Sequence, residues 1–365
     1  MAEQPEQEQA QAREREQARG ERGGTRQPAP PVLEARGVAV TFPARRGHGA
    51  AHAVDDVNLT LGRGEVLALI GESGCGKSTL ARALVGLVVP DRGEIRYLGK
   101  PLRRTRAGLR EFRRHVQLVL QDPYGALNPR QNVHDAVAEG LRLHGQRAGL
   151  TRRVSEALDE VGMRPPEHFF DRYPHQLSGG QQQRVVIAGA LTLGPDVLVA
   201  DEPVSSLDAS VRGEILKLFL QLRDTLGLAA LVVSHDLGLA WNIADRVAVM
   251  YLGRIVEVGP VEDVLLRPQH PYTRALLDAV PSTSQIEAAR VLRGEPPDPT
   301  RIPGGCRFHP RCPLRPTLDE AAAQQCLTDV PVLPPGVGEH AVACHHVTAP
   351  PAASRSPRDP SEVTP

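Results

Sequence analysis

The sequence predicts an α/β fold in which parallel strands alternate with helices, and three observations support this prediction. Val66–Ile70 is a short, continuous apolar run with β-branched members, which is the pattern of a strand buried on both faces. A glycine-rich turn follows it directly, and residues 78–88 then have the apolar spacing of a helix. A strand, a glycine loop and a helix in this order indicate the first unit of a parallel sheet.

Further strands are expected where short apolar runs end in polar residues. Two segments alternate in the manner of strands exposed on one face, and three others have the continuous apolar character of buried strands. The alternating segments are 38–42 and 53–61, and the continuous ones are 116–120, 197–200 and 230–234. Strands interleaved with helices in this way favour a parallel sheet over an all-β arrangement.

One long segment interrupts the alternation. Residues from about 122 to 185 contain few strand-like runs, whereas 133–143 and 152–161 have helical spacing. We interpret this segment as a helical insertion into the α/β core. The chain shows no internal repeat, so a single α/β unit is expected rather than a tandem pair.

Charge and hydropathy exclude several classes of partner. The 365 residues carry 43 basic and 43 acidic side chains, and this balance gives no basic field for nucleic acid. No run approaches the ~18 apolar residues of a membrane span, and the N-terminus lacks the apolar stretch of a secretory signal. We therefore expect the chain to remain in the cytosol.

The segment Gly71–Ser78 matches the phosphate-binding pattern G-x-x-x-x-G-K-[ST] in its required place between a strand and a helix. Glycines let backbone N–H groups curve around a phosphate chain, and the positive end of the following helix faces the same anion. Lys77 supplies a point charge for the β and γ phosphates of ATP, and Ser78 a hydroxyl for Mg²⁺. Cys75 is interpreted as a small filler. The expected nucleotide ligands are Gly71, Ser73, Gly74, Cys75, Gly76, Lys77, Ser78 and Thr79.

Two carboxylates end the apolar run 197–200. Ligands of α/β folds bind at the carboxyl ends of the strands, so Asp201 and Glu202 are expected near the phosphate loop. Asp201 suits Mg²⁺ coordination, directly or through water. Glu202 can orient or deprotonate the water that attacks the γ-phosphate.

The segment Leu177–Arg184, with the sequence LSGGQQQR, resembles the signature of the ABC ATPase family. Ser178, Gly179 and Gly180 offer a hydroxyl and exposed amides at a helix start, which is a second anion site. The resemblance implies that these residues and Gln181 contact the γ-phosphate held by the opposite subunit. It also implies a P-loop NTPase core of the RecA-like type, with an antiparallel β subdomain and an inserted helical signature subdomain.

Other motifs of that family occur in the expected order. Gln121 resembles the Q-loop glutamine that senses the γ-phosphate and metal, and Asp208 lies in a segment, SLD, that resembles the D-loop. His235 resembles the switch histidine, and Phe42 stands where the family places an aromatic residue against adenine. The resemblance thus implies Glu202, His235 and Gln121 as catalytic residues, and Ser78, Gln121 and Asp201 as residues around Mg²⁺.

Within the family, the closest resemblance is to peptide-importer ATPases, on the stretches LQDPYGALNPR (120–130), MYLGRIVE (250–257) and HPYTRALL (270–277). It implies an F-type ATPase that pairs with a related D-type chain, two membrane permeases and an extracytoplasmic binding protein, at the cytoplasmic face of the membrane. Import of nickel or another small solute, and a soluble ABC ATPase without a membrane role, are the alternatives. Gly189 departs from the family, which often has Arg there.

The domain organisation follows from these motifs and from composition. We expect a disordered arm at 1–31, an ABC nucleotide-binding domain at 32–262 with its helical subdomain at about 122–185, a C-terminal extension at 263–346 and a disordered tail at 347–365. Both ends are rich in polar residues or Pro and contain little that could be buried.

Four of the five cysteines cluster late in the chain, and in a reducing compartment such a cluster suggests a metal before disulfides. Four thiolates can hold a [4Fe–4S] cluster or a tetrahedral Zn²⁺. Resemblance to the peptide and nickel importer branch favours the iron–sulfur cluster, while spacing leaves zinc and four unliganded thiols open. The residues are Cys306, Cys312, Cys326 and Cys344.

Overall fold

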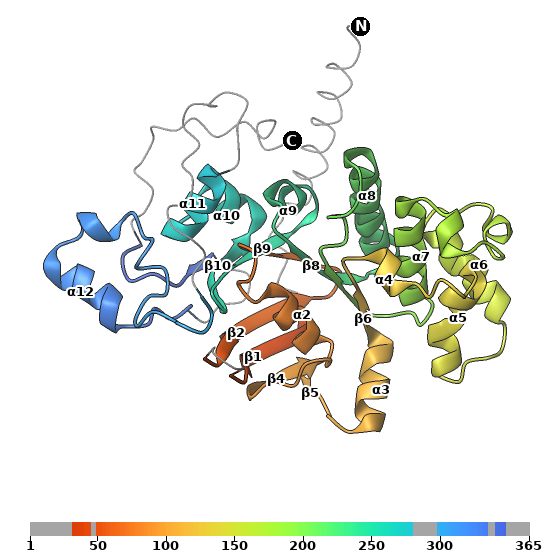
Figure 1. Cartoon of the computed structure of the whole chain (residues 1–365), viewed down its shortest axis with the longest axis horizontal. Helices are drawn as coiled ribbons and strands as arrows, with labels where there is room; N and C mark the ends of the chain where they lie inside the picture. Colours follow the sequence, from red (N-terminus) through yellow and green to blue (C-terminus); the bar gives the residue numbers. More distant parts are fainter. Residues whose placement is uncertain (1–30, 45–48, 280–297, 335–339, 348–365) are drawn as a thin grey trace, which may run out of the picture. The chain divides into compact units, whose positions relative to one another are not determined.

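Two β-sheets organise the part of the chain that the computed structural model describes, residues 31–44, 49–279, 298–334 and 340–347 (Figure 1). The predicted arm at 1–31 lies outside the described residues except for Pro31. The predicted tail at 347–365 lies outside them except for Val347.

The first sheet is antiparallel, with the strand order β2-β1-β4-β5. Its strands are β1 (Pro31–Phe42), β2 (Ala51–Gly62), β4 (Arg92–Tyr97) and β5 (Lys100–Pro101). The predicted segments 38–42 and 53–61 lie within β1 and β2, which are longer because β1 pairs with β2 on one edge and β4 on the other. The sequence reading missed β4 and β5, which are short and largely polar.

The second sheet has seven strands in the order β11-β10-β9-β3-β8-β7-β6. They are β3 (Val66–Ile70), β6 (Val116–Val119), β7 (Val197–Asp201), β8 (Ala229–Ser234), β9 (Arg246–Tyr251), β10 (Arg254–Pro260) and β11 (Ala341–Val342). The five strands from β9 to β6 are parallel, whereas β10 and β11 add antiparallel pairs at one edge. The prediction of a parallel α/β sheet is confirmed, with strand ends shifted by no more than one residue.

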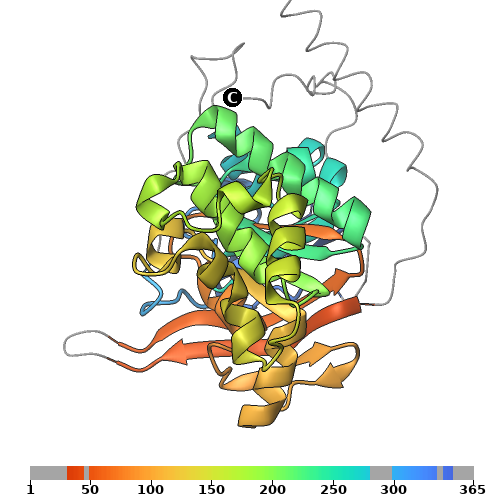
Figure 2. The ribbon, with the colours of Figure 1, turned by 90° about the vertical axis from the view of Figure 1, so that its right-hand side faces the viewer.

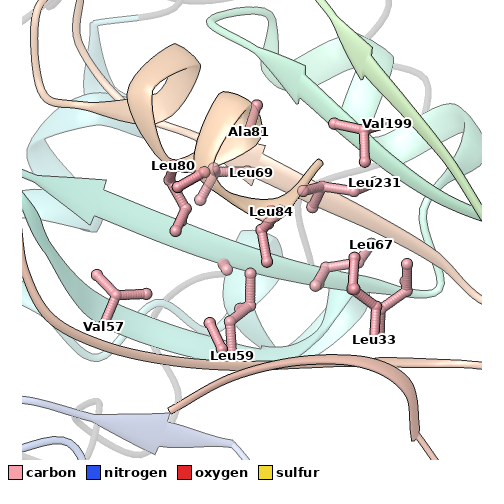
Figure 3. Packing of buried hydrophobic residues seen from close by; sticks show 14 of the residues in the cluster. Leu33, Val57, Leu59, Leu67, Leu69, Leu80, Ala81, Leu84, Val199 and Leu231 are labelled. Atoms are coloured by element: carbon pink, nitrogen blue, oxygen red, sulfur yellow. The ribbon is translucent and has the colours of Figure 1, made fainter. Parts of the chain in front are cut away.

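Helix α2 (Lys77–Leu84) lies between the two sheets (Figures 1 and 3). Its Leu80 and Leu84 are buried and belong to the same cluster as apolar side chains of both sheets. Figure 3 shows Leu67 and Leu69 of β3 with Val57 and Leu59 of β2 around this helix. The helix ends four residues earlier than the predicted 88 because Gly86, at φ 71°, turns the chain.

A helical segment follows strand β6, where the sequence predicted one (Figure 2). It contains α4 (Pro123–Ala126), α5 (Val133–Leu143), α6 (Leu150–Glu160), the short 3₁₀ turns η1 (Pro166–His168) and η2 (Pro174–Gln176), and α7 (Gly179–Leu191). These helices share one buried apolar cluster with the face of the sheet that carries Val66, Leu198 and Ala230.

The remaining helices are α3 (Arg106–His115), α8 (Ala209–Leu226), α9 (Leu237–Ile243), α10 (Val261–Leu266), α11 (Pro271–Asp278) and α12 (Glu320–Thr328), with the 3₁₀ turn η3 (Arg315–Thr317). Residues 298–334 and 340–347, which we call the cysteine segment, lie beside β10 and α11 (Figure 1). The fully buried carboxylate of Glu257 ties these parts together, because it accepts bonds from the backbone N–H groups of Gln269 and His270 and contacts the His340 ring. Within the described ranges, no helix has both the length and the apolar character needed to cross a bilayer.

Candidate functional site

The phosphate-type loop leaves strand β3 at its carboxyl end and turns at two positions that require glycine. Gly71 has φ 153°, and a Cβ there would lie 2.2 Å from the Met250 carbonyl oxygen. Gly76 has φ 107° and caps helix α2, and a Cβ there would lie 1.9 Å from the Ala53 carbonyl oxygen. At these two positions the loop passes too close to neighbouring backbone for any side chain, and this close approach gives it the tight curvature of a loop that can surround an anion.

Lys77 begins helix α2 and is almost fully buried. Its Nζ donates hydrogen bonds to the carbonyl oxygens of Gly71, at 2.7 Å, and Glu72, at 2.9 Å. It also contacts the Cys75 sulfur at 3.8 Å, and none of these three partners is a carboxylate that would compete with a phosphate for the ammonium. The lysine thus stands where the sequence predicted a counter-charge for phosphate.

The Ser78 hydroxyl and the Asp201 carboxylate meet at 3.0 Å, although the two residues are far apart in sequence. Asp201 ends β7, is 4% exposed, and has its pKa raised by burial, against the lowering effect of the Ser78 hydrogen bond. Hydroxyl and carboxylate oxygens are ligands that Mg²⁺ prefers, and a divalent cation would offset the cost of burying this charge. The pair fits a magnesium site beside the phosphate loop.

The three predicted catalytic side chains converge. Glu202 receives a hydrogen bond from Gln121 Nε2 at 3.0 Å on one carboxylate oxygen, and its other oxygen lies 3.2 Å from His235 Nδ1. Gln121 follows β6, Glu202 follows β7 and His235 follows β8, so the carboxyl ends of three neighbouring strands supply the group. Such an arrangement can hold a water molecule against a phosphorus atom and take its proton.

The backbone of Glu202 is in the left-handed region, with φ 47°. Its N–H donates to the Val233 carbonyl at 3.0 Å, and its own carbonyl accepts from the Ser205 hydroxyl at 3.1 Å. A non-glycine residue in this region costs on the order of 1 kcal/mol, so the surrounding bonds hold Glu202 in a conformation that it does not prefer. This conformation directs its carboxylate toward Gln121 and His235.

The signature residues form a well-capped helix start that faces solvent. Ser178 is exposed and caps α7, with its hydroxyl accepting from the Gln181 N–H at 3.3 Å while the Gln181 side chain accepts from the Ser178 N–H at 3.1 Å. A Cβ on Gly180 would lie 2.5 Å from Val211 Cγ1. Among the described residues, no hydrogen bond joins Ser178, Gly179, Gly180 or Gln181 to the loop that contains Lys77.

The other predicted ligands occupy varied positions. Ser73 and Gly74 lie exposed at the tip of the loop, and Thr79 is half-buried in α2. Phe42 ends β1 and is 44% exposed, which leaves its ring accessible, and Asp208 is an exposed residue at the start of α8. Cys75 is buried and burial raises its pKa, which agrees with the interpretation of a small filler.

The four late cysteines line a single cavity, together with Phe308 and the rings of His309, His345 and His346. All four thiols are free, and burial raises their pKa values, that of Cys306 to about 11. Within the described part of the chain, no three His, Cys, Asp or Glu side chains are close enough to form a metal site. The predicted iron–sulfur or zinc site is therefore not supported by the structure, which brings the thiols to one place without arranging them around an ion.

The structure adds a contact to the phosphate loop that the sequence reading did not identify. Arg311, in the cysteine segment, donates to both carboxylate oxygens of Glu72, the second residue of the loop, at 2.7 and 3.0 Å. Tyr272 of α11 accepts a hydrogen bond from the Glu72 N–H at 2.9 Å. The only available signal was that Arg311 adjoins a cysteine and that Tyr272 lies in the stretch 270–277.

Comparison with known families and proteins agrees with this geometry. The family described as "ABC transporter" matches residues 54–205, and "Oligopeptide/dipeptide transporter, C-terminal region" matches residues 256–317. The dipeptide transport ATP-binding protein DppF of Haemophilus influenzae is 42% identical over 326 residues, covering 87% of this chain and 97% of that protein. The oligopeptide transport ATP-binding protein AppF of Bacillus subtilis is 40% identical over 327 residues, covering 86% and 97%.

Solved structures share the fold. CbiO1 from Clostridium perfringens, part of the ABC transporter complex cbiONQ, superposes with a TM-score of 0.57 at 32% identity, covering 64% of this chain and 90% of that one. The ATP-binding cassette MJ0796, in a dimeric post-hydrolysis state bound to ADP and Pi, superposes with a TM-score of 0.56 at 28% identity, covering 63% and 98%. The mixed α/β architecture is thus the one found in these ATPases.

Proposed function

The chain belongs to the ABC transporter family of ATP-binding proteins, in its peptide-import branch, and from this premise we propose how its residues bind and hydrolyse ATP to drive peptide import. The observation that carries the proposal is the meeting of Gln121, Glu202 and His235 beside the Ser78–Asp201 pair. It places a proton acceptor next to a loop built for phosphate.

The nucleotide is held by the loop Gly71–Ser78. Its N–H groups and the start of α2 face the phosphate chain, and Lys77 exchanges its carbonyl contacts for the β and γ phosphates. Ser78 and Asp201 are the residues that would hold Mg²⁺, which when bound offsets charge on those phosphates. Exposed Phe42 offers a ring for adenine.

Hydrolysis uses the Glu202 carboxylate. Gln121 and His235 fix its two oxygens, so that it orients water in line with the γ-phosphorus. The water oxygen forms a bond to that phosphorus, the bond to the bridging oxygen of ADP breaks, and the water proton passes to Glu202. The products are ADP and inorganic phosphate.

Glu202→Gln tests this role because amide and carboxylate have nearly the same shape but only the carboxylate accepts a proton. We expect unchanged MgATP binding and a turnover lowered about 10²- to 10⁴-fold, measured on the assembled transporter. Undiminished turnover with retained binding would contradict the assignment. Glu139→Gln, at an exposed carboxylate in helix α5, provides a comparison for loss of charge away from the phosphates.

A second ATPase chain completes the site in this proposal. The supporting observation is that Ser178 is exposed and that Ser178, Gly179 and Gly180 form a helix start with no hydrogen bond to the phosphate loop of their own chain, as far as the described residues extend. The unlike partner is a related D-type ATPase, and each chain's signature faces the other's nucleotide. Co-expression of both chains should give a one-to-one complex in the presence of ATP, and a stable pair of identical chains would contradict the unlike pairing.

The remaining partners are two membrane permeases and an extracytoplasmic peptide-binding protein, with this chain attached peripherally at the cytoplasmic face. The support is the similarity to relatives named as dipeptide and oligopeptide transport ATP-binding proteins. Co-purification of the chain with its membrane subunits, followed by ATPase assays with added di- and oligopeptides, tests this assignment. Stimulation of ATPase activity by nickel instead of peptides would indicate a nickel importer.

The cysteine cavity is proposed to hold a [4Fe–4S] cluster, with Zn²⁺ as the other outcome of the test. The supporting observation is that four thiols from separate parts of the cysteine segment line one cavity, since four thiolates are the ligand type of either group, although the described side chains do not surround an ion. When bound, a metal would take these cysteines as thiolates and tie the segment together. Visible absorption of anaerobically purified protein and elemental analysis distinguish the two groups, and absence of both iron and zinc would refute the site.

A further inference from the structure

The cysteine segment reaches the phosphate loop through one ion pair. Arg311 holds both carboxylate oxygens of Glu72, across 239 residues of sequence, in the two-bond geometry that guanidinium and carboxylate prefer. The Arg311 side chain is 7% exposed and that of Glu72 is 19% exposed. Because the pair is shielded from solvent, salt screens it little, and removing one partner should have a measurable effect.

Aromatic packing fixes the pair in place. Tyr251 of β9 lies 4.6 Å, centroid to centroid, from Tyr272, and Phe308 packs on these rings at 5.2 and 5.4 Å. All three side chains are fully buried. Tyr272 also accepts the Glu72 N–H, so both the backbone and the side chain of this loop residue are held from outside the nucleotide core.

The charge of Glu72 explains why its ion pair with Arg311 should affect ATP binding. Glu72 is the one acidic residue in the loop Gly71–Ser78, and an unpaired carboxylate there would repel the phosphate chain. Arg311 offsets this charge by bonding to both carboxylate oxygens, while Lys77 bonds to the Glu72 carbonyl. The arginine therefore acts on the nucleotide through Glu72.

The cysteine cavity lies next to this ion pair, although Arg311 itself does not line it. Arg311 directly precedes Cys312, and Phe308 lines the cavity with all four cysteines while packing on Tyr251 and Tyr272. A change in the cavity that moves Cys312 must move Arg311 with it. One peptide bond and one ion pair thus connect Cys312 to the phosphate loop.

We propose that the cysteine segment tunes nucleotide binding within its own chain, with Arg311 as the positioning residue that neutralises and orients Glu72 in the phosphate loop. The proposal rests on the ATPase function proposed above. Weakening of the Arg311–Glu72 pair lowers affinity for MgATP, while the chemistry at Glu202 is left intact.

A double-mutant cycle on the full chain tests the pair, with the dissociation constant of a fluorescent MgATP analogue as the readout. We expect Arg311→Gln to weaken binding about tenfold, because it leaves the Glu72 charge unpaired, and Glu72→Gln to weaken it by less than about threefold. The double variant should bind like Glu72→Gln alone. Additive effects of the two substitutions, or an unchanged constant in Arg311→Gln, would overturn the proposal.

Arg307→Gln is the matched control. Arg307 lies in the same segment and pairs with Asp55, which keeps Arg254 and Arg92 as partners when Arg307 is removed. This variant should lower thermal stability without changing the MgATP dissociation constant by more than about twofold. In the assembled transporter, Arg311→Gln should raise KM for ATP and leave kcat near the wild-type value. If Arg311 had only a structural role, Arg311→Gln would, like Arg307→Gln, lower thermal stability and leave KM unchanged.

Cys312→Ser tests the link to the cavity. It should weaken MgATP binding in the wild-type background and have no further effect in Arg311→Gln, and equal constants for Cys312→Ser and wild type would overturn the link. Lys77→Ala, which should lose most of its affinity for MgATP, is the reference for a chain without the proposed nucleotide site. Failure of the wild-type chain to bind MgATP refutes the function itself, while wild-type binding with an unaffected Arg311→Gln refutes only the present inference.

Discussion

The phosphate loop and the signature segment are both glycine-containing helix starts, yet their surroundings differ. Helix α2 begins at Gly76 with no side-chain cap, and its loop is enclosed by strand ends and by Arg311 and Tyr272. Helix α7 begins after Ser178 with a complete capping box of its own, and Ser178 is exposed. The first contacts other parts of its own chain, which hold Glu72 in place. The second satisfies its first N–H groups with its own side chains, and in the function proposed above it contacts the nucleotide of a second chain.

The largest expected effect is on the enclosed site. Lys77→Ala removes the one buried ammonium of the loop, and we expect MgATP affinity to fall about a hundredfold or more, since hydrogen bonds to charged groups are worth roughly 1.5–3 kcal/mol each. Equilibrium dialysis with labelled ATP on the separate chain measures it. Unchanged affinity would mean that the two helix starts do not differ in the way described.

Acid should destabilise the surroundings of the phosphate loop more than the start of helix α7. His270 caps α11 by accepting from the Tyr272 N–H through Nδ1, and its burial lowers the pKa to about 4 from 6.5. Between pH 6.5 and 4, His270 binds a proton in the unfolded chain but stays neutral in the folded chain. The free energy of unfolding therefore falls as pH falls, by about 3 kcal/mol in total.

The corresponding measurement is thermal unfolding from pH 7 to pH 4. His270→Asn keeps a capping side chain but does not titrate, and should flatten the acid branch of the stability curve. The groups that face His270 are Glu257 and Arg274, which the variant leaves in place. Identical pH profiles for the variant and the wild type would rule out His270 as the source.

A smaller effect is expected at the exposed start. Ser178→Ala should cost α7 about 1 kcal/mol through loss of the cap, leave ATP binding to the separate chain unchanged, and reduce ATPase activity only once the second chain is present. Ser178→Asn, which restores a cap while changing the group offered to the nucleotide, separates the two contributions. Impaired ATP binding by the separate Ser178→Ala chain would show that α7 serves its own chain's site.

The smallest predicted change is a stabilisation. Gly189 lies inside α7, where an added Cβ would meet nothing closer than 3.9 Å, so Gly189→Ala should raise the free energy of unfolding by up to about 1 kcal/mol. The same change at Gly76 would drive a Cβ to 1.9 Å from Ala53 and should destroy nucleotide binding. Chemical denaturation of both variants measures this difference between the two helices.

Local patterns predicted the centre of the fold well and its margins less well. Val66–Ile70 is apolar throughout because β3 is covered on both sides, and such a run can be recognised without its neighbours. The strands β4 and β5 were missed because they are short and largely polar, and β11 because it has only two residues. The strands β9 and β10 were missed because the stretch 250–257, which overlaps both, was interpreted by its family resemblance alone.

The candidate site shows the same division. Lys77, Asp201 and Glu202 stand in short patterns whose spacing reflects a strand end, so the sequence predicted them as site residues, and in the structure Asp201 bonds to Ser78, the neighbour of Lys77. The pairing of Glu72 with Arg311 has no such pattern. It depends on how β10, α11 and the cysteine segment fold back over the sheet, and only the packed structure contains that information.

Strand β11 has a consequence for the behaviour of shortened chains. Ala341 and Val342 pair with Val258 and Glu257 of β10, an otherwise outermost strand whose residues 255–259 are buried. A chain that ended before Ala341 would expose the backbone N–H and C=O groups of an apolar edge, and such edges join strand to strand between molecules. The last described residues thus protect the protein against aggregation, and trimming them to improve solubility would have the opposite result.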